Sequence, residues 1–207
     1  MTGVQTCALP ILGSLKIKKN VTLNGNATTT TEVDGTYSFR ILDKAGREVG
    51  SATITIKDGV SGETQVDNLK VGTYKVMEDT TGNPLGVMLV GKNGIEVEVT
   101  ENNITGVPIV EFTNNLECKM VSGEKTWNMQ GYDERLMPKS ITVYVKDGES
   151  TVDTLTVKAG EDNKWSFTSK ELPRYRADGK TEINYTVDEK VPEGFNKVVT
   201  GDRKSVV

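Results

Sequence analysis

The chain has 207 residues and a formal net charge of -4 at pH 7, with 26% charged and 35% hydrophobic residues. This length allows one or two domains, and the composition is typical neither of a membrane protein nor of a disordered one. The acidic balance argues against nucleic acid as the main partner, and no apolar run is long enough to cross a bilayer. The absence of histidine removes the commonest metal ligand and general base, so we expect no metal and no cofactor.

Both ends of the chain resemble translated sequencing-library adapter. TGVQTCALPI near the start and DRKSVV at the end both correspond to adapter DNA read in frame. We therefore expect residues 1–11 and 201–207 to be artefacts that take no part in the fold, and the chain to be a fragment of a larger gene. The alternative is a genuine short N-terminal segment. Because Cys7 falls in the first artefact, Cys118 remains as the one native thiol and no disulfide is expected.

The first half of the chain consists of short alternating segments. Strict alternation predicts a strand over Leu15–Leu23 that carries Lys19 on its apolar face. Asp58-Gly59 is a hairpin signal at the end of the third strand. No window has a sustained helical period, so helix content should be low. Strands separated by Gly, Asn and Asp turns predict a β-sandwich, with the later strands at 36–42, 52–56, 66–69, 74–78, 87–90, 95–99 and 107–114.

The same order of segments begins again near residue 118. The stretch Val121–Trp127 repeats the first strand and carries Lys125 in the place of Lys19, and alternating segments follow at 141–145, 152–157, 165–167 and 183–189. We predict two tandem modules, residues 12–117 and 118–200, each of ordinary domain size. The predicted fold class is all-β, with two tandem immunoglobulin-like or prealbumin-like β-sandwiches.

Three polar residues of the first module lie in phase with apolar residues: Lys19, Glu78 and Asn114. The first and last strands of a sandwich are often neighbours, so these side chains could meet in the core. A buried lysine loses its proton readily and becomes a nucleophile, while a buried carboxylate takes one up. The lysine could then form a side-chain amide with the asparagine as ammonia leaves. The alternatives are a solvated lysine and glutamate at a sheet edge, or a buried ion pair.

The second module resembles the Cna B-type repeat, a prealbumin-like module of Gram-positive surface adhesins and pilins. The residues that carry the resemblance are GEKTW at 123–127, PKSI at 138–141, WSF at 165–167, LPRY at 172–175 and YTVDE at 185–189, with Pro192, Gly194 and Phe195. The first module is similar to the related pilin-type isopeptide domains through Tyr74, Val76 and Glu78 and through Phe112-Thr113-Asn114.

The resemblance implies a role for each of these residues. In this family a lysine of the first strand bonds covalently to an asparagine of the last strand, with an acidic residue as catalyst. Lys19 and Asn114 would then be the bond partners and Glu78 the catalyst. Lys125 and Glu189 correspond in the second module, but the asparagine-bearing strand should follow Val199, where adapter begins. The second sandwich is therefore expected to be truncated at its last strand and to keep Lys125 as an unpaired isopeptide lysine.

The resemblance also implies a function. We expect a structural stalk or repeat module of a bacterial cell-surface adhesin or pilin, located outside the cell at the cell wall. Its partners would be neighbouring repeats and, through domains outside this fragment, host extracellular matrix, with no nucleic acid and no membrane. The alternative is an adhesive module that itself binds host matrix or glycan. The chain should not be an enzyme, because isopeptide formation is a single intramolecular turnover.

Overall fold

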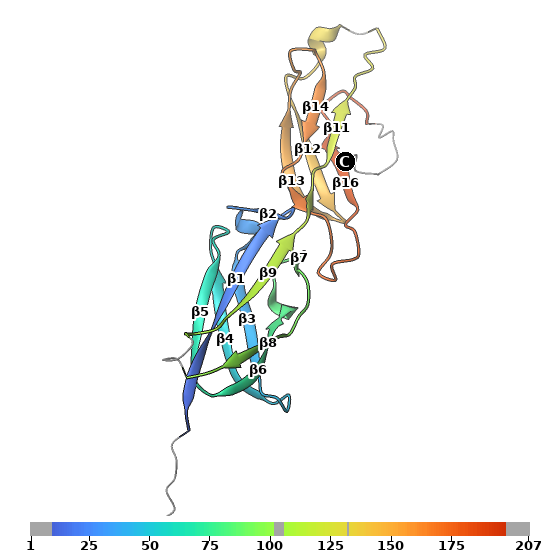
Figure 1. Cartoon of the computed structure of the whole chain (residues 1–207). Coiled ribbons are helices and arrows are strands. Elements are labelled where there is room, and N and C mark those ends of the chain that lie inside the picture. Colours follow the sequence, from blue (N-terminus) through green and yellow to red (C-terminus); the bar gives the residue numbers. More distant parts are fainter. Residues whose placement is uncertain (1–9, 102–105, 132, 198–207) are drawn as a thin grey trace, which may run out of the picture. The chain divides into compact units, whose positions relative to one another are not determined.

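The computed structural model describes residues 10–101, 106–131 and 133–197, and the chain divides into two compact units, Met1–Glu117 and Cys118–Val207 (Figure 1). Strands make up most of the described residues, among which there are short 3-10 helices and no α-helix. The all-β prediction is therefore confirmed. The expected adapter segments lie outside the described residues except for Pro10 and Ile11, and so does the expected site of the last strand of the second sandwich.

Unit 1 contains two sheets. In the first sheet the strand order is β2-β1-β9-β7, and β5 also pairs with β1; the second sheet has the order β4-β3-β6-β8. The strands of the first sheet are β1 (Leu12–Leu23), β2 (Asn26–Ala27), β5 (Gly62–Lys70), β7 (Val87–Leu89) and β9 (Ile109–Leu116). Those of the second are β3 (Gly35–Leu42), β4 (Glu48–Ile56), β6 (Gly72–Asp79) and β8 (Ile95–Val99).

The first and last strands of unit 1 lie side by side and run parallel (Figure 1). Their register pairs Lys19 with Phe112 and Val21 with Asn114. Because side chains alternate between the faces of a strand, these four residues share one face of the sheet. Leu15 and Ile17 precede them on the same face of β1 and are fully buried. The period-two pattern thus directs this face into the core.

Aromatic side chains join the two sheets of unit 1. Phe39 of β3 and Phe112 of β9 are both buried, and their ring centroids are 5.2 Å apart with the planes tilted by 45°. Tyr37 of β3 is also buried, and its hydroxyl donates a hydrogen bond to the carbonyl oxygen of Val33 at 2.7 Å. These buried rings form part of the core between the two sheets.

The Asp58-Gly59 turn differs from an ordinary hairpin. Both residues have positive φ, 53° and 66°, as a tight two-residue turn requires. One bridge, between Lys57 and Val60, closes the turn, but β4 then pairs with β3 while β5 pairs with β1. The turn therefore directs the chain from one sheet to the other. The carboxylate of Asp34 accepts hydrogen bonds from both turn amides, at 2.8 and 2.9 Å.

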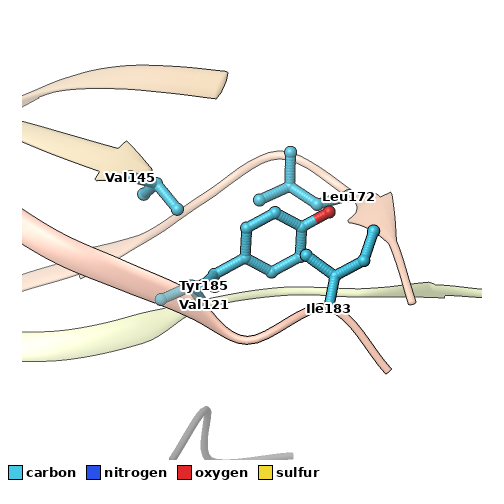
Figure 2. Close-up of a cluster of buried hydrophobic side chains, with 5 residues drawn as sticks. All are labelled: Val121, Val145, Leu172, Ile183 and Tyr185. Atoms are coloured by element: carbon cyan, nitrogen blue, oxygen red, sulfur yellow. The ribbon is translucent and has the colours of Figure 1, made fainter. Parts of the chain in front are cut away.

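The described part of unit 2 contains one three-stranded and two two-stranded sheets, with orders β13-β12-β16, β11-β14 and β10-β15. Figure 2 shows one of its core clusters, in which the ring of Tyr185 lies among Val121, Val145, Leu172 and Ile183. The Tyr185 hydroxyl donates to the carbonyl oxygen of Pro173 at 2.7 Å. The strands are β10 (Cys118–Lys119), β11 (Ser122–Lys125), β12 (Ile141–Asp147), β13 (Ser150–Val157), β14 (Trp165–Thr168), β15 (Leu172–Pro173) and β16 (Tyr185–Lys190).

We expect Phe112→Ala to destabilise unit 1 by about 3–5 kcal/mol, because it removes a buried ring that contacts both sheets and leaves a cavity. Denaturant unfolding followed by circular dichroism measures this. Val60→Ala is the control, since Val60 is 65% exposed and its truncation should change the midpoint little. Equal midpoints for the two variants would contradict the packing described here.

Candidate functional site

Three buried polar side chains from both sheets meet in the core of unit 1. Lys19 and Asn114 are 0% exposed and Glu78 is 2% exposed. Lys19 lies on β1, Asn114 on the neighbouring β9, and Glu78 on β6 of the opposite sheet. The structure thus brings together the three residues that the sequence placed on apolar strand faces. Solvation at a sheet edge, one alternative considered above, does not apply to side chains this deeply buried.

The three side chains form a closed ring of hydrogen bonds. Lys19 Nζ donates to Glu78 Oε2 at 2.6 Å and also to Asn114 Oδ1. Asn114 Nδ2 donates to Glu78 Oε1 at 2.6 Å. Each oxygen of the carboxylate therefore faces a different partner, one facing the amine and the other facing the carboxamide nitrogen. The amine also touches the carbonyl end of the carboxamide.

Aromatic residues lie close to the Lys19 end of this ring. Lys19 Nζ lies 4.7 Å from the centroid of the Tyr37 ring, and Phe112 is the register partner of Lys19 on β9. Burial lowers the pKa of the Lys19 amine to about 8, although its hydrogen bond and ion pair with Glu78 oppose the shift. Burial also raises the pKa of the Tyr37 phenol, with smaller contributions from the charges of Glu78 and Asp34. The tyrosine is therefore a neutral neighbour, while the amine loses its proton far more easily than a surface lysine.

The arrangement supplies the parts needed for acyl transfer to an amine. A lysine with a lowered pKa is a usable nucleophile, and a carboxyl group in contact with both nucleophile and leaving nitrogen can move protons between them. The burial of all three side chains keeps competing water away. The same contacts also describe a buried ion pair, which is costly because both charges leave water.

Unit 2 contains a second lysine–glutamate pair with different surroundings. Lys125 Nζ of β11 donates to Glu189 Oε1 of β16 at 2.9 Å, and lies 4.9 Å from the centroid of the Trp127 ring. The two side chains are 19% and 11% exposed, so this pair is less buried than the pair in unit 1. Within the described part of unit 2, no carboxamide contacts Lys125, and β11 has a strand partner, β14, on one side only.

Two asparagines that contact Glu78 were missed by the sequence analysis. Asn83 and Asn93 lie in the connections on either side of β7, and both hydrogen-bond to Glu78. Each is followed by a residue typical of turns, Pro84 or Gly94, and this pattern predicts a turn and no functional site. Only their position after a candidate catalytic glutamate could have drawn attention to them.

The described residues offer no metal site and no membrane-spanning helix. No group of three or more His, Cys, Asp or Glu side chains in this part of the chain could hold a metal ion. No helix there is both long enough and apolar enough to span a bilayer.

Comparison with known proteins concerns mainly unit 2. Residues 121–207 match the family model described as the Cna protein B-type domain. This part of the chain is therefore similar to a Cna B-type domain. A search of curated proteins finds no match to this sequence.

Solved structures that align with most of the chain include B repeat units of the protein Cna. Two B repeat units of the collagen-binding protein Cna of Staphylococcus aureus are 20% identical with a TM-score of 0.42, over 93% of this chain and 48% of that one. The Bacillus anthracis TIE protein is 21% identical with a TM-score of 0.39, over 92% and 30%. A single B repeat unit of Cna is 18% identical with a TM-score of 0.32, over 88% of both chains. The chain thus spans about half the length of the first of these structures and less of the second.

A chain that cannot form the Lys19–Asn114 bond should become more stable as pH rises above about 8. The unfolded chain holds the Lys19 proton up to the ordinary lysine pKa of about 10.4, while the folded chain, with its lowered pKa, releases it earlier. In that window the unfolded state binds more protons, so the free energy of unfolding of Asn114→Ala should rise by up to about 1.4 kcal/mol per pH unit.

Urea unfolding of Asn114→Ala between pH 7 and about 9, one unit below the ordinary tyrosine pKa of about 10, measures this slope. The matched control is the same variant with Lys19→Met added, which has no amine to titrate at this position. An equal pH dependence in both proteins would show that Lys19 is not desolvated in the fold.

Proposed function

We propose that the chain is a structural repeat module of a bacterial surface protein, and that unit 1 is cross-linked by an isopeptide bond between Lys19 and Asn114. The single observation that supports the cross-link is the closed ring of hydrogen bonds among the buried side chains of Lys19, Glu78 and Asn114. The ring contains a nucleophile, a proton carrier and an amide in mutual contact.

The reaction begins with a proton transfer within the ion pair. Glu78 Oε2 takes a proton from the Lys19 ammonium, which leaves two neutral groups in place of two buried charges. The neutral Nζ then attacks Cγ of Asn114. The Nζ–Cγ bond forms, the Cγ–Nδ2 bond breaks, and one amine proton moves to Nδ2 through the carboxyl group, so that ammonia leaves. Glu78, which has given its first proton to Nδ2 and taken a second one from Nζ, ends the reaction protonated and hydrogen-bonds to the new amide.

Burial favours the product over the starting groups. An ion pair in an apolar core bears a desolvation penalty that its Coulomb attraction only partly offsets. An amide carries no charge, so the cross-linked core avoids most of that penalty. The departure of ammonia into water also makes the step effectively irreversible. The chain's own fold therefore drives the reaction, and no cofactor is needed.

The cross-link would stabilise unit 1 both thermodynamically and mechanically. Its ends are 95 positions apart in the sequence, and by analogy with a disulfide of this loop length it would stabilise the fold by about 4–5 kcal/mol. Because β1 and β9 are the first and last strands, a pull on the chain at either end of the unit reaches the bond directly. The intervening strands would then bear little load.

Such a module suits a stalk outside the cell. The Cna B-type match of residues 121–207 supports a surface repeat, and the similar B repeat units belong to a collagen-binding protein. Neighbouring repeats of the parent protein are the proposed partners, and binding to host matrix is assigned to domains outside this chain. The chemistry is a single turnover within one chain, so the protein is not proposed to act as an enzyme on other molecules.

We expect the purified chain, weighed under denaturing conditions, to be lighter than its sequence by the mass of one ammonia molecule. Lys19→Ala and Glu78→Gln should each have the full sequence mass, because the first lacks the nucleophile and the second lacks the proton carrier. Full mass for the unsubstituted chain would show that Lys19 and Glu78 form only an ion pair.

The second lysine provides the matched control. Lys125→Ala should keep the loss of one ammonia, because no carboxamide contacts Lys125 in the described part of unit 2. If Lys125→Ala restored the full mass, the bond would belong to unit 2 and the assignment to Lys19 would be wrong.

A further inference from the structure

Glu78 lies on β6 beyond the point where the pairing of β6 with β8 ends. The pairing of β6 with β8 runs from Gly72 opposite Val99 to Val76 opposite Ile95 and stops there. On the other side of β6, the pairing with β3 continues and places Phe39 opposite Glu78. The catalytic carboxylate is therefore carried by a residue whose backbone has a strand partner on one side only.

The side chain of Asn93 takes the place of the missing strand. Its Oδ1 accepts from the backbone nitrogen of Glu78 at 2.9 Å, and its Nδ2 donates to the carbonyl oxygen of the same residue at 2.8 Å. A carboxamide has the same donor and acceptor as a peptide group, so one side chain satisfies both backbone groups. Asn93 thus fixes the backbone from which the carboxylate projects.

Asn83 holds the carboxylate itself. Its Nδ2 donates to Glu78 Oε1 at 2.9 Å, the same oxygen that accepts from Asn114 Nδ2. Lys19 contacts the other oxygen, Oε2. Asn83 Oδ1 is buried and has no hydrogen-bond partner in the structure. The hydrogen bond that the Asn83 side chain makes in the described structure is therefore the one that Nδ2 donates to Glu78.

A short cap keeps Asn83 in this position. Thr80–Gly82 form a 3-10 turn in which the carboxylate of Asp79 accepts from the backbone nitrogen of Thr81 at 3.1 Å. The backbone nitrogen of Asn83 closes the turn on the carbonyl oxygen of Thr80 at 3.3 Å. The turn brings the chain back over the end of β6, so that a residue five positions after Glu78 reaches its carboxylate.

We propose that Asn83 and Asn93 are positioning residues for the cross-linking reaction, and this inference rests on the proposed Lys19–Asn114 bond. Asn93 sets the backbone of Glu78, and Asn83 sets the rotation of its carboxylate. Together they keep Oε2 on the attacking amine and Oε1 on the departing nitrogen. Without them the carboxyl group would be free to rotate. Either Oε2 would lose contact with the attacking amine, or Oε1 would lose contact with the departing nitrogen.

The Lys125–Glu189 pair of unit 2 lacks such support in the described residues. There the backbone nitrogen of Glu189 donates to the neighbouring Asp188 carboxylate at 2.8 Å, and Lys125 is the one side chain that contacts the Glu189 carboxylate. A lysine–glutamate pair can therefore form without two asparagines, which is consistent with a role for Asn83 and Asn93 beyond the ion pair itself.

The test measures the rate of the reaction as well as its yield. Unreacted chain from a short cell-free synthesis is kept in denaturant, then refolded by dilution at a series of pH values. Intact mass at timed intervals gives the fraction that has lost ammonia, and circular dichroism on the same samples gives the folded fraction. The variants are Asn83→Ala, Asn83→Leu and Asn93→Ala. Asn83→Leu approximately keeps the volume of the side chain and removes its Nδ2 donor together with Oδ1, which has no hydrogen-bond partner.

We expect both Asn83 variants to lose ammonia at least about tenfold more slowly per folded chain, as for a misplaced catalytic group. The rate should have a bell-shaped pH profile, because it needs one proton shared between Lys19 and Glu78. Because Asn83 donates to the carboxyl group that carries the proton, both Asn83 variants should also change this profile. Asn93→Ala should slow the reaction and leave the profile unchanged, because Asn93 acts on the backbone.

The matched control is Asn20→Ala. Asn20 follows Lys19 in the sequence, and its amide donates a hydrogen bond to the surface carboxylate of Glu111, which the substitution removes. It should react like the unsubstituted chain. An unchanged rate and profile in Asn83→Leu would show that Asn83 only fills space and would overturn its role here. If the unsubstituted chain folded and lost no ammonia, the cross-link itself would be refuted, and the positioning proposal with it.

Discussion

The burial of the Lys19 amine is the constraint on which the rest of unit 1 depends. A lysine side chain that is 0% exposed would be strongly destabilising without a partner, and here it has two, a carboxylate and a carboxamide, with an aromatic ring close by. The partners hold the amine in the core, and the core lowers its pKa. The same feature that makes the unlinked fold costly therefore makes the lysine reactive, and the proposed bond removes that cost permanently.

The topology of unit 1 determines where such a bond can be useful. The parallel pairing of β1 with β9 puts the first and last strands in contact, so that Lys19 and Asn114 share one face although they are 95 positions apart. Glu78 reaches them from the opposite sheet. The proposed bond at this place would tie the first strand of the unit to the last, as the proposed role of a repeat under load requires.

The sequence predicted strand phase well and tertiary detail poorly, for a physical reason. The alternation of apolar and polar residues in Leu15–Leu23 and around Tyr74 and Phe112 is a local signal. The structure places Lys19, Glu78 and Asn114 on the buried strand faces that this signal indicates. The exchange of sheets after Asp58-Gly59 and the end of β11 at Lys125, two residues before the predicted end, depend on packing partners far away in the chain. Asn83 and Asn93 act from loops, where no periodicity exists to reveal them.

The central claim is a covalent bond between two particular atoms, so the most direct measurement is tandem mass spectrometry of a protease digest. The account predicts a branched peptide in which the Lys19 side chain is joined to the Asn114 side chain, lighter than its two parts by one ammonia molecule. Two separate linear peptides, one with an unmodified Lys19 and one with an unmodified Asn114, would contradict it.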